Sequence, residues 1–287
     1  MPELPEVETI RRALAPLVEG RVVTALTVHD PRWTQPLHPA EVADAVTGRR
    51  LDQLLRRGKY LQFAFEDDVN LLVHLRMTGT LLYDAPTERP YRRVTFMLDD
   101  GHALAFCDPR RFGTGELALG APALAAFYGP RVGIEPLDDA LTGRLLKLLA
   151  RGRRASVKAF LLDQRQIAGV GNIYADEALF RARIHPLRPA GSLTGRQCDA
   201  LAGAVRDALE AGLKAGGATI DDFRRPDGTY GAFQDEFLVH RRAGKPCPEC
   251  ATAIVKLVAA GRGTYVCPRC QPVPRVRSPR LKPCSGI

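Results

Sequence analysis

The stretch CPECATAIVKLVAAGRGTYVCPRC, residues 247–270, contains two Cys-x-x-Cys pairs that are 16 residues apart. This spacing is typical of a structural zinc finger, in which each short turn directs two thiolates at one tetrahedral ion. The segments 254–258 and 264–266 between the pairs predict a β-hairpin. Four thiolates leave no open coordination position, so we expect one structural Zn²⁺, with the ligands Cys247, Cys250, Cys267 and Cys270.

Two redox-active cysteine pairs are the alternative interpretation of this stretch. The surrounding sequence lacks the βαβ pattern of a thioredoxin-like protein, so metal binding is favoured. Cys107, Cys198 and Cys284 lie outside the pairs and are expected to be inert thiols. Arg262 lies between two glycines at the expected hairpin tip, where a guanidinium is well placed to bind a phosphate, although an ordinary surface arginine would look identical.

The net charge of the chain is concentrated at its C-terminal end. The chain has 41 Lys+Arg and 32 Asp+Glu, which gives +9, and residues 241–287 alone contain ten basic residues against one acidic residue. A neutral body with a basic C-terminal module favours a polyanionic partner, of which nucleic acid is the commonest. A basic tail that only increases solubility is the alternative.

Length and composition indicate a globular protein with more than one domain. A chain of 287 residues exceeds the usual single core, and 45% hydrophobic with 25% charged residues excludes intrinsic disorder and fibrous repeats. No run of 18 apolar residues occurs, and the acidic N-terminus has no apolar segment behind it. The sequence therefore predicts neither a membrane span nor a secretory signal, and we expect a cytoplasmic protein.

The order of the expected elements indicates an α+β protein. Apolar residues recur at helical spacing over residues 3–17, which predict a helix that Pro16 and Gly20 end. Strands followed by helices, rather than alternating with them, are typical of a β-sandwich or barrel joined to a helical domain. Strands are expected at 22–27, 60–65, 70–75, 80–83, 94–98 and 102–106, and helices at 141–149, 156–162, 173–180 and 193–215.

The N-terminal residues Met1-Pro2-Glu3 have the chemistry of a nucleophile. Removal of Met1 would expose the secondary amine of Pro2, and an α-amine is roughly a tenth unprotonated at neutral pH. Such an amine condenses with an aldehydic carbon to give a charged iminium, which favours elimination of a nearby substituent. Glu3 is adjacent and can transfer protons. An ordinary frayed terminus is the alternative, since many proteins begin Met-Pro.

Three further motifs, taken together with the cysteine pairs, indicate a family. They are PELPEVET at residues 2–9, DPRRFG at 108–113 and GVGNIY at 169–174. In this order, over residues 2–271, the chain resembles the formamidopyrimidine-DNA glycosylase family of the Fpg/Nei superfamily. The resemblance implies an N-terminal helix with a β-sandwich, a helical domain with a helix-two-turns-helix motif, and a zinc β-hairpin. The implied divisions are a catalytic β-sandwich domain at 1–134, a DNA-binding helical domain at 135–235, a zinc finger at 236–271 and a basic disordered tail at 272–287.

The same resemblance implies a bifunctional enzyme of base excision repair. It would excise oxidised purines, such as 8-oxoguanine and formamidopyrimidines, from double-stranded DNA and then cut the abasic strand by β- and δ-elimination. We expect it to act as a monomer, associated with the nucleoid. A Nei-like glycosylase for oxidised pyrimidines is the nearest alternative. A non-catalytic zinc module that binds damaged DNA is the alternative from another class, against which the intact Pro2, Glu3 and Lys59 argue.

Several residues take roles through this resemblance. Pro2 would attack C1′ of the damaged nucleotide, with Glu3 as general acid and base and Glu6 as a buried supporting carboxylate. Lys59 matches a lysine of β-elimination, and Arg262 matches the zinc-finger arginine of δ-elimination. The implied DNA-binding residues are His74, Arg93, Arg110, Arg153, Arg154, Lys158 and Asn172, and the residues that fill the space left by the extruded nucleotide are Met77, Arg110 and Phe112.

Three features depart from the family pattern. Residues 91–93 read Tyr-Arg-Arg where two histidines are frequent, so a cationic phosphate contact is kept there through Arg93. Asp221 lies in the loop 216–229, which closes over the extruded base, at a position where a lysine is frequent. The lesion preference is therefore open. The chain also continues past Gln271, where the family commonly ends.

Overall fold

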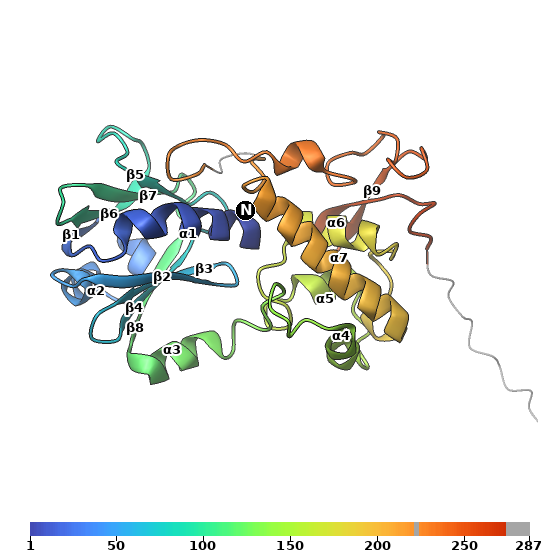
Figure 1. The fold of residues 1–287 in the computed structure, drawn as a ribbon, viewed down its shortest axis with the longest axis horizontal. Coiled ribbons are helices and arrows are strands. Elements are labelled where there is room, and N and C mark those ends of the chain that lie inside the picture. The colour runs from blue at the N-terminus through green and yellow to red at the C-terminus, as the bar shows by residue number, and fades with distance from the viewer. Residues whose placement is uncertain (221–223, 274–287) are drawn as a thin grey trace, which may run out of the picture.

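Helix α1 (Leu4–Val18) connects the two halves of the molecule, which the computed structural model describes for residues 1–220 and 224–273 (Figure 1). Its apolar residues recur every three or four positions, and Val7, Ile10 and Leu14 pack into the core of the N-terminal half. Leu4 belongs instead to the core of the C-terminal half. The first residues of the chain are therefore held where the two halves meet.

The end of α1 differs from the expectation at Pro16. This residue lies inside the helix, which ends two residues later at Val18. A proline in the last turn removes only one backbone hydrogen bond. The amide of Glu19 still donates to the carbonyl of Ala15, with an N–O distance of 3.0 Å, so the final turn closes in spite of the proline.

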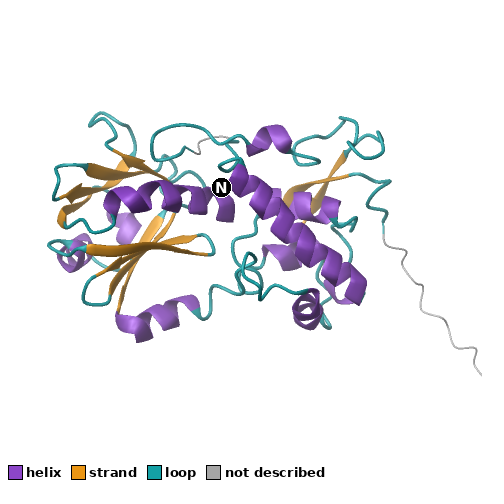
Figure 2. Cartoon of the chain, in the orientation of Figure 1, coloured by secondary structure: helices purple, strands orange, loops and turns teal. Residues whose placement is uncertain are grey.

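Two four-stranded antiparallel sheets form the N-terminal half (Figure 2). Their strand orders are β1-β6-β7-β5 and β2-β3-β4-β8. The sheets share one core, in which the ring of Phe63 from β3 stacks on that of Phe96 from β6 with centroids 5.5 Å apart. The predicted β-sandwich is confirmed. The strand bounds are Val23–Val28 (β1), Leu51–Arg57 (β2), Tyr60–Phe65 (β3), Val69–His74 (β4), Thr80–Tyr83 (β5), Arg92–Leu98 (β6), Ala103–Cys107 (β7) and Thr114–Leu119 (β8).

Six of these strands lie within two residues of their expected bounds, whereas the sequence does not predict β2 and β8. Both are edge strands of the same sheet. An edge strand leaves part of its surface in water, so it does not need a continuous apolar run. In β2 only Leu51 and Leu54 are buried, and the remaining positions are polar or partly exposed. The short helices α2 (Pro39–Val46) and η1 (Pro31–Thr34) between β1 and β2 also give no strong pattern.

Four helices form most of the C-terminal half, and each lies within two residues of its expected bounds. Three of them begin at a side-chain cap, in which the hydroxyl of Thr142, Ser156 or Thr194 accepts a hydrogen bond from a backbone amide of the first turn. Among the helices of the described residues, none combines the length and apolarity that crossing a bilayer requires. The bounds are Gly143–Ala150 (α4), Val157–Leu162 (α5), Asn172–Arg181 (α6) and Gly195–Lys214 (α7), preceded by α3 (Gly120–Tyr128).

Strands β9 (Val255–Ala259) and β10 (Arg262–Val266) form the predicted antiparallel hairpin. The hairpin packs beside the helical half through a small core that includes Phe180 of α6 together with Val239 and Ile254. Figure 1 shows this segment next to α6, at the end of the molecule away from the sandwich. The domain boundaries at 134, 235 and 271 stay a prediction.

Candidate active site

A cleft of about 860 Å³ opens where the N-terminal end of α1 meets both halves of the molecule. It collects residues that are far apart in the sequence, including all four of the expected catalytic residues. The N-terminal half lines it with Met1, Pro2, Glu3, Glu6, Lys59, His74, Met77 and Arg110, and the C-terminal half with Asn172, Ile173, Ala218, Ile220, His240 and Arg262.

Glu3 is placed by the first turn of α6. Its carboxylate is 2% exposed and accepts hydrogen bonds from the amides of Ile173 at 2.9 Å and Tyr174 at 3.4 Å. The positive end of the helix dipole stabilises a negative charge at this position. Gly171 makes the approach feasible, because a Cβ at this residue would lie 2.3 Å from the Glu3 carboxyl carbon. The GVGNIY motif at residues 169–174 therefore forms the binding site for the side chain of Glu3.

Glu6 fixes the backbone of the same segment. One of its carboxylate oxygens accepts from the Glu3 amide at 2.8 Å, which completes a capping box at the start of α1. The other oxygen accepts from the Tyr174 hydroxyl and the Ala218 amide, both at 2.7 Å. Burial raises the pKa of Glu6, and the nearby Glu3 carboxylate raises it further. Glu6 therefore ties α1 to α6 and to the segment after α7.

Lys59 reaches the cleft from the turn between β2 and β3. The side chain is 5% exposed. Burial lowers its pKa below the ordinary value for lysine, although the carboxylates of Glu3 and Glu6 oppose the shift. An ammonium with a lowered pKa gives up its proton more readily, so this lysine is suited to proton transfer as well as to charge stabilisation.

His74 is a neutral imidazole at the side of the cleft. Burial lowers its pKa to about 3, helped by the positive charges of Arg76 and Lys59. Its Nδ1 accepts a hydrogen bond from the Arg76 amide at 2.9 Å, from which we infer that Nε2 carries the proton. His74 therefore offers a phosphate a neutral N–H donor, not a cation.

The three expected space-filling residues lie on two neighbouring loops. Met77 follows β4, and Arg110 and Phe112 lie between β7 and β8. Met77 and Arg110 line the cleft, and the Arg110 guanidinium lies 4.9 Å from the centroid of the Phe112 ring. Phe112 is 50% exposed, so half of its surface is accessible to a bound partner.

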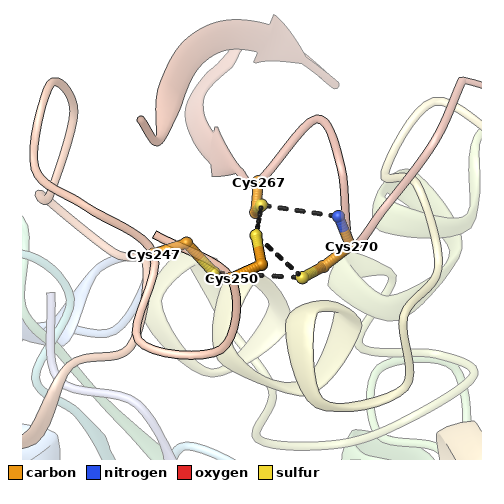
Figure 3. A group of neighbouring side chains, drawn as sticks. All are labelled: Cys247, Cys250, Cys267 and Cys270. Carbon is orange, nitrogen blue, oxygen red and sulfur yellow. Dashed lines mark hydrogen bonds between the residues drawn. The ribbon is translucent and has the colours of Figure 1, made fainter. Parts of the chain in front are cut away.

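The four expected zinc ligands form one cluster (Figure 3). The sulfur–sulfur distances are 3.5 Å for Cys250–Cys267, 3.6 Å for Cys250–Cys270 and 3.9 Å for Cys247–Cys270. A tetrahedral ion about 2.3 Å from each sulfur requires sulfur atoms about 3.8 Å apart. Both the thiolate donors and their spacing fit one structural zinc ion.

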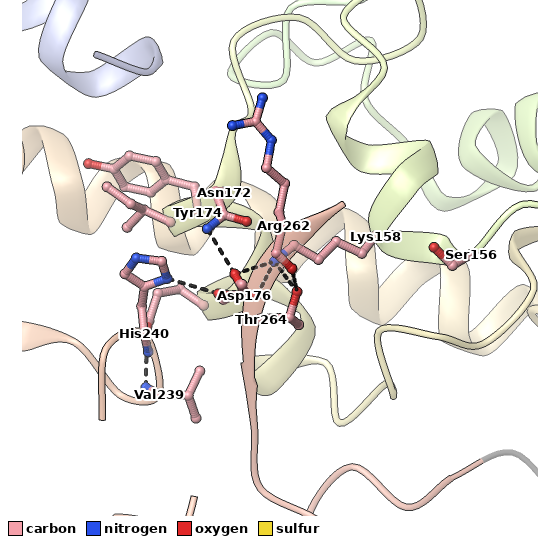
Figure 4. A network of polar contacts seen from close by, with 12 residues as sticks. Ser156, Lys158, Asn172, Tyr174, Asp176, Val239, His240, Arg262 and Thr264 are labelled. Carbon is pink, nitrogen blue, oxygen red and sulfur yellow. Dashed lines mark hydrogen bonds and ion pairs between the residues drawn. The ribbon is translucent and has the colours of Figure 1, made fainter. Parts of the chain in front are cut away.

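The zinc hairpin touches the start of α6 directly. The side-chain amide of Asn172 donates to the carbonyl of Gly263 at 3.0 Å, and Gly263 follows Arg262 in the hairpin. Figure 4 shows the Arg262 side chain extending away from this contact, and Arg262 lines the cleft. The structure therefore brings the two expected phosphate-binding residues, Asn172 and Arg262, to one wall.

Lys158 requires a correction, because it is fully buried and cannot contact a DNA backbone from this position. Its ammonium donates to the Asp176 carboxylate at 2.6 Å and to the Thr264 hydroxyl at 2.7 Å (Figure 4). The other carboxylate oxygen of Asp176 bonds to His240 Nδ1 at 2.8 Å. These bonds link α5, α6 and β10, so Lys158 is a structural cation that holds the zinc hairpin against the helices.

The other three expected DNA-binding residues, Arg93, Arg153 and Arg154, do not line the cleft. The Nε of Arg93 donates to the carbonyl of Asp108 at 2.9 Å, and that of Arg153 donates to the carbonyl of Leu149 at 2.7 Å. Both side chains are half-buried, whereas Arg154 is exposed. Asp221 and residues 274–287 lie outside the described residues.

The sequence did not predict a role for three buried residues of α6, which are Tyr174, Asp176 and Glu177. The Glu177 carboxylate accepts from the amides of residues 238, 239 and 240, so it holds the segment that leads to the zinc hairpin. Two consecutive acidic residues in an otherwise apolar helix are the signal that marks them, because buried carboxylates require dedicated partners.

Family models of known proteins match the chain in three consecutive segments. The formamidopyrimidine-DNA glycosylase N-terminal domain matches residues 1–115, and the H2TH domain of the same proteins matches residues 132–224. A zinc finger found in FPG and IleRS matches residues 244–273.

Whole proteins match as well. The chain is 47% identical over 279 residues to a formamidopyrimidine-DNA glycosylase of Alkalilimnicola ehrlichii, covering 94% of this chain and 100% of that one. It superposes with a TM-score of 0.85 on a crystal structure of MutM (Fpg) from Thermus thermophilus, at 43% identity and covering 94% and 98% of the two chains. A complex of Lactococcus lactis Fpg with DNA that contains Fapy-dG gives 0.87 at 34% identity, covering 94% and 100%.

Proposed function

The chain belongs to the formamidopyrimidine-DNA glycosylase family, and we propose that its cleft carries out both reactions of such an enzyme, base excision and cleavage of the abasic strand. The position of the N-terminus in the cleft is the observation that best supports the roles assigned to individual residues. Pro2 is buried where both halves meet, and it lines the same cleft as Glu3, whose carboxylate lies at a helix N-terminus, and Lys59, whose pKa is lowered.

The first step needs a free nitrogen on Pro2, which removal of Met1 provides. The nitrogen attacks C1′ of the damaged nucleotide, and the glycosidic bond breaks as the base leaves with its electron pair and a proton. Glu3 transfers protons at this stage, held by the start of α6. The product is an iminium between Pro2 and the opened deoxyribose, and it withdraws electrons from the neighbouring carbon.

The second step uses this electron demand to cut the strand. Loss of a proton from C2′ expels the 3′ phosphate, and a further elimination expels the 5′ phosphate. We assign proton transfer and charge neutralisation in β-elimination to Lys59, and the grip on the departing phosphates to Arg262 and Asn172. The contact between Asn172 and Gly263 supports this assignment, because it places both proposed phosphate-binding residues beside the start of α6, whose amides hold Glu3.

We propose that Met77, Arg110 and Phe112 fill the space that the extruded nucleotide leaves. Exposed Phe112 and the stacked guanidinium of Arg110 support this role, since base removal requires unstacking and the vacancy must be occupied. His74, Arg93, Arg153 and Arg154 remain candidates for contacts to the DNA backbone, and one structural zinc ion holds the hairpin that carries Arg262.

The family acts in base excision repair, and the solved complexes of relatives support a substrate class for this chain. Structures of relatives contain DNA with Fapy-dG, an abasic site or carbocyclic 8-oxo-G, so we infer oxidised purines as the main lesions. A complex of the Lactococcus lactis enzyme with an oxidised pyrimidine favours a second activity on such bases. Competition between duplexes that contain different defined lesions measures which lesions the enzyme prefers. We propose that the enzyme works in the cytoplasm and associates with the nucleoid.

Borohydride trapping tests the proposal. Protein with a processed N-terminus is incubated with a lesion duplex and borohydride, and we expect a covalent adduct. A form whose N-terminal nitrogen is blocked by an uncleaved extension should not give it, although it should still bind the duplex. A missing adduct with processed wild-type protein would favour the non-catalytic DNA-binding module. An equal adduct with the blocked form would show that Pro2 is not the nucleophile.

A further inference from the structure

Asp108 is a buried carboxylate between the two loops that carry the space-filling residues. Its side chain is completely buried. One oxygen accepts from the Arg110 amide at 3.1 Å and from the Thr78 hydroxyl. The other accepts from the amides of Phe112 and Gly113, both at 2.8 Å. One carboxylate thus binds the loop of Arg110 and Phe112 and also the residue that follows Met77.

These four bonds leave the carboxylate little freedom. Its hydrogen-bond partners are three amides and a hydroxyl, and hydrogen bonds to an ionised group are stronger than those between neutral groups. A buried carboxylate that lost them would be strongly disfavoured. Gly113 adds a steric limit, because a Cβ there would lie 2.3 Å from the Phe106 ring, so the chain passes directly over the core.

A second carboxylate holds the same loop from its other side. Arg111 adopts a left-handed backbone conformation with φ of 59°. Its guanidinium binds the buried Asp30 through two bonds, with N–O distances of 2.5 and 2.8 Å. Asp30 therefore holds Arg111 while Asp108 holds its two neighbours, and Arg110 and Phe112 stack on each other.

We propose that Asp108 is a positioning residue, which joins the two loops through Thr78 so that Met77, Arg110 and Phe112 form one rigid wedge before DNA binds. This inference rests on the space-filling role proposed above. A wedge of this kind matters only when a nucleotide must leave a stacked duplex. It has no part in forming the iminium on a single-stranded abasic site, where nothing has to be extruded.

The experiment compares two rates for each variant: single-turnover excision from a lesion duplex, and borohydride trapping on a single-stranded abasic oligonucleotide. Thr78→Val removes the link between the loops and keeps the size of the side chain. We expect duplex excision to slow on the order of tenfold, the size of one lost hydrogen bond to a charged group, with unchanged single-strand trapping. Thr78→Ser, which keeps the hydroxyl, should restore the duplex rate.

Thr114→Val is the matched control. Its hydroxyl is buried and has no hydrogen-bond partner within the described residues, so the same chemical change should leave both rates unchanged. Asp108→Asn should have a larger effect than Thr78→Val, on the order of 100-fold on duplex, because a neutral amide cannot accept four bonds. If Asp108→Asn fails to fold, the comparison of Thr78→Val with the wild type is sufficient to test the positioning role of Asp108.

Met77→Ala and Phe112→Ala separate this inference from the proposed function. If neither variant lowers the ratio of duplex to single-strand rates, the space-filling role itself is wrong. If both lower it while Thr78→Val and Asp108→Asn do not, the space-filling role stands and the positioning role of Asp108 is overturned. An equal loss of both rates in Thr78→Val would also overturn it, since that result indicates general damage to the fold.

Discussion

The zinc hairpin and the floor of the cleft are built in opposite ways. By the floor we mean Glu3, Glu6 and Lys59 together with the backbone amides that bind the two carboxylates. All four ligands of the hairpin lie within residues 247–270, so local chain geometry alone brings them together. The floor joins Glu3 to Ile173 across 170 positions, and Lys59 arrives from a third segment. A site made from one segment is visible in residue spacing, whereas a site made from distant segments exists only after the fold has formed.

The two regions also differ in what stabilises them. The hairpin has a small apolar core and relies on its metal ligands. The floor relies on burial and on hydrogen bonds to carboxylates, with Glu3 and Glu6 receiving backbone amides from three segments. Removing the metal should therefore damage one region and spare the other, and changing a buried charge on the floor should do the reverse.

Removal of zinc should have the largest effect, and this effect should be confined to the hairpin. Structural zinc sites supply about 10 kcal/mol or more of binding free energy, which is also folding free energy. After chelation we expect the amides of β9 and β10 to lose their protection from hydrogen exchange. The amides of β3 and β4, in the sandwich, are the internal control and should stay protected. Persistent protection of the hairpin in metal-free protein would contradict the comparison.

Glu3→Gln should have the next largest effect, and it affects the floor alone. The variant keeps the size of the side chain but removes the charge and the proton transfer, so we expect base excision to slow on the order of 1000-fold. Single-turnover excision measures the rate, and the zinc content should be unchanged. Glu8→Gln, on the same helix but outside the cleft, is the control. A Glu3→Gln enzyme within tenfold of the wild type would exclude the proposed role.

Lys158→Met tests the contact between the two regions. Removing one partner of a buried ion pair costs about 3 kcal/mol or more of unfolding free energy, which denaturant unfolding measures. The salt dependence of DNA affinity should be unchanged, because Lys158 is buried. Exposed Arg154 is the matched case: Arg154→Ala should leave stability unchanged and reduce the slope of affinity against salt by about one. If Lys158→Met also reduced the slope of DNA affinity against salt, Lys158 would contact DNA after all, and the structural role assigned to it here would be wrong.

His74 gives the smallest effect, a change of stability with pH. The unfolded histidine binds a proton below about pH 6.5, but the folded one does so only near its pKa of about 3. The unfolded state therefore gains protons first as the pH falls, and stability is lost through the window between these values. Between pH 7 and 5 the loss is about 2 kcal/mol. Unfolding measured at both values should show it in the wild type and not in His74→Gln; equal pH dependence would contradict the neutral imidazole.

The sequence predicts the hairpin almost completely, because four cysteines at fixed spacing leave few arrangements. It also predicts most of the strands and helices, and it fails at β2 and β8, where edge positions relax the apolar pattern. Glu3 could be proposed from its position beside the N-terminal amine, whereas Lys59 could be proposed only through the family resemblance. Their partners Ile173 and Tyr174 could not be derived, since no local pattern encodes a contact across 170 residues.

Lys158 shows the limit of an assignment made from a motif. Its position in the chain is compatible with either a DNA contact or a buried pair, and only the surrounding Asp176 and Thr264 decide between them. Asp108 is the converse case. It belongs to a recognised motif, yet its bonds to two loops become visible only in three dimensions.

The division of α1 between two cores limits how the molecule can be recombined. Leu4 is buried by the helical half, and Val7, one turn later, by the sandwich. A chimera that exchanges one half for that of a relative must therefore preserve the socket for Leu4, or the terminal imino group loses its alignment even when each half folds well. The first seven residues therefore have to match both halves at once.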